Sequence, residues 1–142
     1  MPSLDPALAV QKAIRARLTG VAAVTALVSA ASILDRNERP APDPTIILGE
    51  DQVVDPGTSI ARDTARVHST IHIWKTEPSL VGVKTIAGAI WKALKGSPLI
   101  LDAGLECGDC RVVDTRFLRD PDGETSHGIV RVETLVREVA DA

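Results

Sequence analysis

The stretch CGDC, from Cys107 to Cys110, is the most chemically suggestive motif in the chain. A CxxC pair suits redox chemistry when it opens a helix, because the helix dipole lowers the pKa of a thiol, but the residues that follow here are typical of a strand. A structural zinc site needs four ligands. His68 and His72 alternate onto one face of a predicted strand and are the candidates to complete it. A small metal-binding module or metal-dependent enzyme is therefore one alternative. The simpler interpretation is two small, partly buried thiols in a turn that leads into a strand.

Ser126 and His127 are the other pair that invites a catalytic hypothesis. Neighbours on a strand point to opposite faces, so an adjacent serine and histidine do not form a nucleophile and base pair. The chain has no Asp-x-Asp calcium loop and no glycine-rich phosphate loop of the Walker type. We predict that it is not an enzyme and has no catalytic residue, no metal ligand and no cofactor.

The composition of the chain disfavours further functional classes. Aromatic residues make up 2% of the chain, as Trp74, Trp91 and Phe117, so no platform for stacking bases is expected. The net charge of -3 disfavours nucleic-acid binding, which draws on clustered Lys and Arg. No apolar run approaches the roughly 20 residues that span a bilayer, so we predict no membrane partner.

Hydrophobic periodicity and turn residues predict an α+β fold in a single domain, residues 1–142. The expected helices and strands follow in the order α, α, β, β, β, α, β, β, β. The helices are expected at 4–20, 21–30 and 79–96, and the strands at 31–35, 45–50, 65–75, 99–107, 110–119 and 128–139.

Caps, breakers and turn residues place the boundaries of these elements. Asp5 is expected to cap the first helix and Ser79 the last. Residues 36–44 hold three prolines and predict an extended connector. Residues 51–64 predict a long polar loop. The stretch Asp120–Gly123, DPDG, has the residues that a tight hairpin turn prefers.

Several stretches, in this order, resemble the tail-completion family that includes the tail terminators of long-tailed phages and gene transfer agents. They are LAVQKAIRARLTGVAAVTALV, ILDRNERP, TIILGEDQVVDPGT, IHIWKTEPSLVGVKTIAGAIWKAL and RFLRDPDGETSHGIVRVETLV. The resemblance spans nearly the whole chain. The most specific pieces are GEDQ after a strand, HIW before the helix and RDPDG in the hairpin, whereas CGDC is not a feature of the family.

The resemblance implies a mostly antiparallel sheet covered on one face by helices. It implies a structural virion protein, assembled in the host cytoplasm, that forms a homohexameric ring on the tail tube and joins it to the head-side connector. Its partners would be other copies of itself, the major tail tube protein and the head-side stopper or connector, and DNA would pass through the lumen without specific binding. A head-completion or stopper protein of the neck is the alternative.

A ring of identical copies brings one patch of each copy against a different patch of the next. We expect the sheet edges and charged loops to supply such patches. The candidate interface residues are Asp51, Asp55, Arg62, Asp63, Arg119, Asp120 and Asp122.

Overall fold

A single five-stranded sheet organises the computed structural model, which describes residues 5–36, 42–102 and 104–139. The strand order is β1-β2-β3-β5-β4; β1 runs parallel to β2, and every other neighbouring pair is antiparallel. The strands are β1 (Ile33–Leu34), β2 (Thr45–Val54), β3 (Thr64–Thr76), β4 (Leu105–Arg119) and β5 (Thr125–Glu138).

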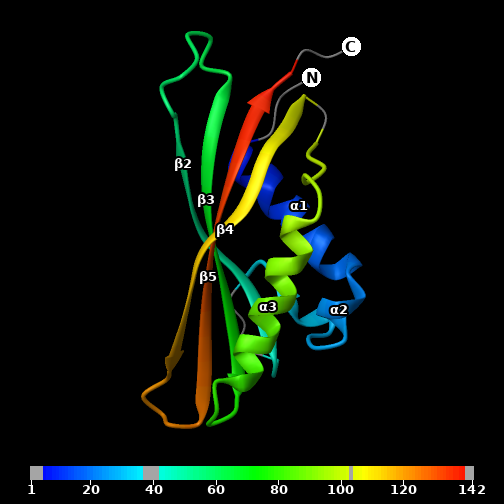
Figure 1. Ribbon diagram of the computed structural model, residues 1–142, viewed down its shortest axis with the longest axis vertical. Coiled ribbons are helices and arrows are strands. Elements are labelled where there is room, and N and C mark those ends of the chain that lie inside the picture. The colour runs from blue at the N-terminus through cyan, green and yellow to red at the C-terminus, as the bar shows by residue number, and fades with distance from the viewer. Residues whose placement is uncertain (1–4, 37–41, 103, 140–142) are drawn as a thin grey trace.

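The helices all lie on one face of this sheet (Figure 1). They are α1 (Pro6–Gly20), α2 (Ala22–Thr25), the short 3-10 turn η1 (Ala30–Ser32) and α3 (Val81–Lys95). Asp5 caps α1 as predicted, because its carboxylate accepts hydrogen bonds from the amides of Ala7 and Leu8. No helix among the described residues has the length and apolar character that crossing a bilayer requires.

The core forms where the inward-facing residues of the sheet pack against the apolar faces of the helices. On β3, Val67, Ile71 and Ile73 alternate toward the helices and are almost fully buried. On α3, Val83 and Ile90 lie two helical turns apart on the buried face and pack into the same core. The α+β class, with helices covering one face of a mostly antiparallel sheet, is confirmed.

Two hairpins lie at opposite ends of the long axis of the molecule (Figure 1). One joins β2 to β3 through residues 55–63, and the other joins β4 to β5 through residues 120–124. In the second turn Gly123 adopts a φ of 74°, a backbone region that glycine enters without steric cost. The predicted turn at Asp120–Gly123 therefore forms.

Several boundaries differ from the prediction. The second helix ends at Thr25 rather than at residue 30, and Ala30–Ser32 is a 3-10 turn, so that only Ile33–Leu34 of the strand expected at 31–35 forms. Residues 51–54 continue β2 rather than starting a loop, because they pair with β3 as far as Val54. The described residues 99–102 and 104 are not in a strand, and Leu105–Arg119 is one strand instead of two, since bulges let it follow β5 without a break. Leu80 occupies the cap position of α3, while the Ser79 hydroxyl accepts a hydrogen bond from the amide of Val81. The predicted connector at 36–44 lies partly outside the described residues.

Candidate assembly surfaces

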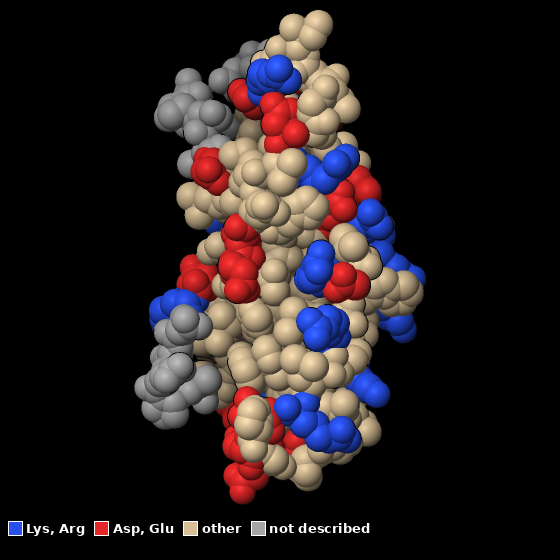
Figure 2. All heavy atoms as spheres, turned by 90° about the vertical axis from the view of Figure 1, so that its left-hand side faces the viewer, with Lys and Arg blue, Asp and Glu red and all other residues tan. Residues whose placement is uncertain are grey.

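The sheet face opposite the helices is open in the described part of the chain, and it carries charges of both signs (Figure 2). Strand alternation decides which side chains reach it. His68, His72 and Trp74 project from β3, and His127 and Arg131 project from β5. The open face is therefore a polar surface built on rigid strands.

A chain of hydrogen bonds crosses this face from β2 through β3 to β5. His72 Nε2 lies 2.7 Å from Glu50 Oε1, and His72 Nδ1 lies 2.9 Å from His127 Nε2. The ring of His127 stacks on Trp74 with centroids 3.7 Å apart and planes 9° apart. The four side chains act as one unit, because each fixes the orientation of the next.

The direction of these hydrogen bonds follows from Glu50, whose carboxylate can only accept. His72 therefore donates through Nε2, and its Nδ1 accepts from His127 when both rings are neutral. Burial, and then the neighbouring His72, lower the pKa of His127. The hydrogen bond from His72 lowers the pKa of Glu50. This arrangement is stable with a charged Glu50 and a neutral His127.

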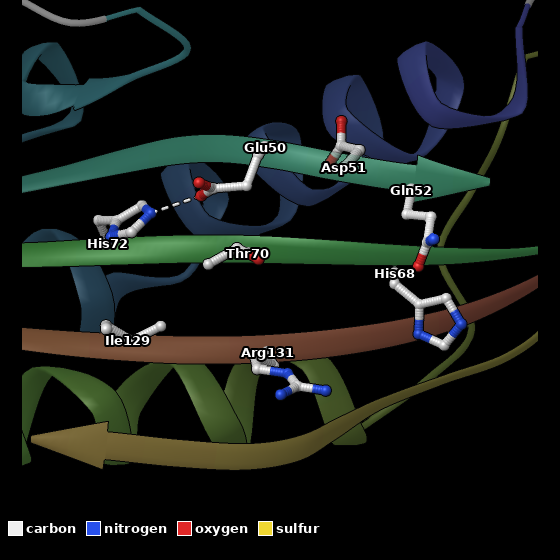
Figure 3. Close-up of a pocket in the computed structure, with 8 residues that line it drawn as sticks. All are labelled: Glu50, Asp51, Gln52, His68, Thr70, His72, Ile129 and Arg131. Atoms are coloured by element: carbon white, nitrogen blue, oxygen red, sulfur yellow. Dashed lines mark hydrogen bonds and ion pairs between the residues drawn. The ribbon is translucent and has the colours of Figure 1, made fainter.

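A hollow of about 550 Å³ lies beside these hydrogen-bonded side chains on the open face (Figure 3). In it Glu50 points toward His72, while His68 and Gln52 lie together at the other end. Its remaining lining residues are Asp51, Thr70, Ile129 and Arg131. The described residues include no cluster of three His, Cys, Asp or Glu side chains able to hold a metal ion. Such a mixture of donors and acceptors suits polar contacts with another protein surface.

Ser126 and His127 point to opposite faces of the sheet, which is what strand alternation predicted from the sequence. Ser126 is buried on the helical side, where its hydroxyl lies 2.7 Å from the carbonyl oxygen of Glu77 and 2.9 Å from that of Ser79. Its role is to fasten β5 to the segment that leads into α3.

The four ligands of the zinc alternative are not brought together. Cys107 and Cys110 both face the helices and are 8% exposed, whereas His68 and His72 lie on the open face. Burial raises the pKa of both thiols, which makes them poor nucleophiles and poor metal ligands. The structure therefore favours the simpler interpretation, in which Cys107 and Cys110 are small buried side chains of the core.

The β2–β3 loop carries three of the candidate interface residues. Asp55 accepts a hydrogen bond from the amide of Gly57 and pairs with Arg62 at 3.7 Å. Asp63 accepts from the hydroxyl of Ser59, and this hydrogen bond lowers its pKa. These carboxylates shape the loop, and their charges remain on its exposed surface.

The β4–β5 hairpin carries three more. Asp122 accepts hydrogen bonds from the amides of Glu124 and Thr125 and from the hydroxyl of Thr125, which lower its pKa. Asp120 closes the turn through its backbone, and Arg119 Nε lies 3.4 Å from the carbonyl oxygen of Pro78. Asp122 is therefore first a turn-forming residue.

The candidate interface residues do not form one surface. Those of the two hairpins lie at opposite ends of the molecule, and Asp51 lies on β2 (Figure 1). The sequence did not predict the hydrogen bonds that link Glu50, His72 and His127. The alternation of β3 placed His72 on this face, but the register that brings His127 beside it is a tertiary property.

The fold and these surfaces define a structural assembly protein. Among the described residues, its sheet exposes polar edges and two hairpins, and its two buried thiols are directed into the core. The chain belongs to the family described as "Tail completion protein gp17", whose profile matches residues 12–137. It is a structural component of the virion tail.

Solved structures share this fold along nearly the whole chain. A chain from the "Virion of native gene transfer agent (GTA) particle" is 21% identical, with a TM-score of 0.82 over 95% of this chain and 99% of that one. The "Structure of bacteriophage SPP1 gp17 protein" is 20% identical, with a TM-score of 0.60 over 94% of this chain and 91% of that one. No curated protein matches the chain in sequence.

Proposed function

We propose that the chain forms a homohexameric ring that caps the tail tube and joins it to the head-side connector, with a lumen through which DNA passes. The observation that carries the proposal is the placement of the two hairpins at opposite ends of one rigid sheet (Figure 1). A ring protein between two other rings needs a contact at each end. Membership of the tail-completion family supports this role.

The β2–β3 loop, residues 55–63, faces the tail tube in this proposal. The β4–β5 turn, residues 120–124, reaches a neighbouring copy or the adjoining ring. Arg62 and Arg119 are the exposed charges that set encounter and register at these ends, as charges at the rim of an interface do. The modest negative charge of the whole chain lets DNA pass without adhering.

Cryo-electron microscopy of the neck of assembled particles tests the proposal. The expected density is a ring of this chain on the last ring of the tail tube, with the head-side connector on its other side. If the chain contacts only head-side proteins, the proposed function is wrong and the stopper alternative holds.

A loop variant tests the assignment of the ends. Replacing Asp55–Asp63 by Asn-Gly is expected to leave a folded chain, because none of these residues belongs to the buried core. Particles that carry this variant should contain tails that do not join heads, counted by negative-stain microscopy. The matched control is Thr58→Ala in the intact loop. Normal joining by the loop variant would contradict the assignment.

A further inference from the structure

An apolar groove between α3 and β4 has no occupant among the described residues. Ala87, Gly88, Trp91, Thr115 and Phe117 line it, together with Lys84. Trp91 is 46% exposed. An exposed tryptophan is a good candidate for an interface residue, because tryptophan is enriched among the residues that contribute most to binding. A Cβ built on Gly88 would meet no atom within 4 Å, so the floor of the groove is open.

The rim of this groove is positively charged. Lys84, Lys92 and Lys95 all lie on α3, and none of them forms an ion pair with a described carboxylate. The ammonium of Lys95 lies 3.8 Å from the ring centroid of Trp91. A partner for this groove must therefore bring both apolar surface and negative charge.

Strand β4 forms the edge of the sheet beside this groove, and its shape limits how a partner can bind. Its register is broken by bulges between Cys107 and Asp109 and between Val112 and Asp114. Bulges turn an edge away from continuous pairing with an added strand. Recognition here therefore rests on side chains rather than on a long backbone ladder.

The opposite edge of the same molecule has the complementary properties. Beyond its short pairing with β1, strand β2 carries Asp51 on its helical side, near the cap residue Asp5, and Glu50 on the open face, hydrogen-bonded to His72. None of these three carboxylates pairs with a described Lys or Arg. Val53 on this edge is 44% exposed. Figure 2 shows Lys and Arg along the right-hand margin of the open face and most carboxylates in its left half.

We propose that the α3–β4 groove of one copy receives the acidic β2 edge of the next copy. Val53 and Asp51, which share one side of β2, would contact Trp91 and the lysines beside it, and Glu50, on the other side of the strand, would lie at the margin of the same contact. The contact joins two different patches, which is the geometry that closes a ring of identical chains. The inference rests on the proposed ring and specifies which surfaces build it. Strands β3 and β5 separate the two edges within one chain by roughly 14 Å, at about 4.8 Å per strand spacing.

Zero-length carbodiimide coupling of assembled particles tests this contact directly. The reagent joins a carboxylate to an amine only where the two touch. We expect links from Glu50 or Asp51 to Lys84 or Lys95 in species of two or more chains, identified by mass spectrometry. Interchain links only at other residues would overturn the assigned surfaces while leaving the ring intact. Tails with no interchain link would count against the ring as well.

Charge reversal on each edge provides the second test. The double variant Lys84→Glu/Lys95→Glu makes both edges acidic, and Glu50→Lys/Asp51→Lys makes both edges basic. Each alone should lower the number of joined particles at least tenfold, and co-expression of the two should restore it by alternating around the ring. Lys12→Glu on α1, at an exposed position outside both proposed edges and both hairpins, is the charge control. Failure of the mixture to restore assembly, with both variants folded by circular dichroism, would overturn the proposal.

Gly88 allows the groove to be filled without disturbing the core. Gly88→Leu should fold, because its side chain enters open space, and should block assembly. Gly20→Leu is the matched control, since Gly20 also lies in a helix with nothing within 4 Å of a built Cβ. Normal assembly by Gly88→Leu would show that the groove is not an interface.

Discussion

His127 shows how a single side chain couples the open face to the stability of the fold. Burial and the nearby His72 lower its pKa, and Asp120 opposes them weakly. The unfolded chain therefore takes up this proton at a higher pH than the folded chain. The contribution of His127 to the free energy of unfolding is complete above about pH 6.5 and is lost as the pH falls below it.

We predict that His127→Asn flattens the fall in the free energy of unfolding between about pH 7.5 and 5.5. One proton accounts for at most about 1.4 kcal/mol per pH unit. Urea denaturation at a series of pH values measures the slope. His68→Asn is the control, because His68 lies outside the hydrogen-bonded chain. A slope unchanged by His127→Asn would refute the prediction.

Ser126 gives a second prediction at the same scale. Its hydroxyl is buried and lies within hydrogen-bond distance of two backbone carbonyl oxygens. Ser126→Ala leaves those carbonyl groups without this donor, and we expect a loss of about 1–3 kcal/mol in the free energy of unfolding. Thr58→Ala, in an exposed loop, should change it by less than about 0.5 kcal/mol. Equal effects of the two variants would show that the hydroxyl carries no stabilising role.

Helix α3 has two faces with separate tasks. The buried face, which includes Ile90, closes the core over the sheet, while the exposed face beside Trp91 borders the groove. We predict that Ile90→Ala lowers the free energy of unfolding by about 2–5 kcal/mol, since it leaves a cavity. Val81→Ala, at a position 67% exposed, is the control and should have little effect. Denaturant titration distinguishes the two.

The β4–β5 turn depends on the backbone of one residue. Gly123 has a φ of 74°, and a Cβ built there meets no atom within 4 Å, so any penalty for alanine comes from backbone conformation alone. We predict that Gly123→Ala destabilises the chain by about 1–2 kcal/mol, measured by thermal unfolding. Gly20→Ala, in a helix, is expected to be neutral or stabilising. A neutral Gly123→Ala would mean that the turn relaxes into another conformation.

The whole molecule is an elongated plate with a basic groove at one edge and an acidic strand at the other. Contacts between copies through these edges depend on charge, and salt screens such charges: the Debye length falls from about 10 Å at 0.1 M to about 3 Å at 1 M. We predict that raising salt over this range reduces the yield of links between the acidic and basic edges in assembled particles. An unchanged yield would mean that apolar contact alone holds the edges together.

The sequence by itself determined helices α1 and α3, most of strands β3 and β5, the hairpin turn and the family, because these depend on local periodicity, turn residues and the order of short motifs. Only the tertiary structure decided that His72 meets His127, that the cysteines and histidines lie on opposite faces, and that Gly88 floors a groove beside Trp91. Those juxtapositions depend on strand register and on the packing of α3 against β4. No local pattern encodes them, since His72 and His127, the histidines and the cysteines, and helix α3 and strand β4 are all distant in sequence and take up their relative positions only when the sheet is complete.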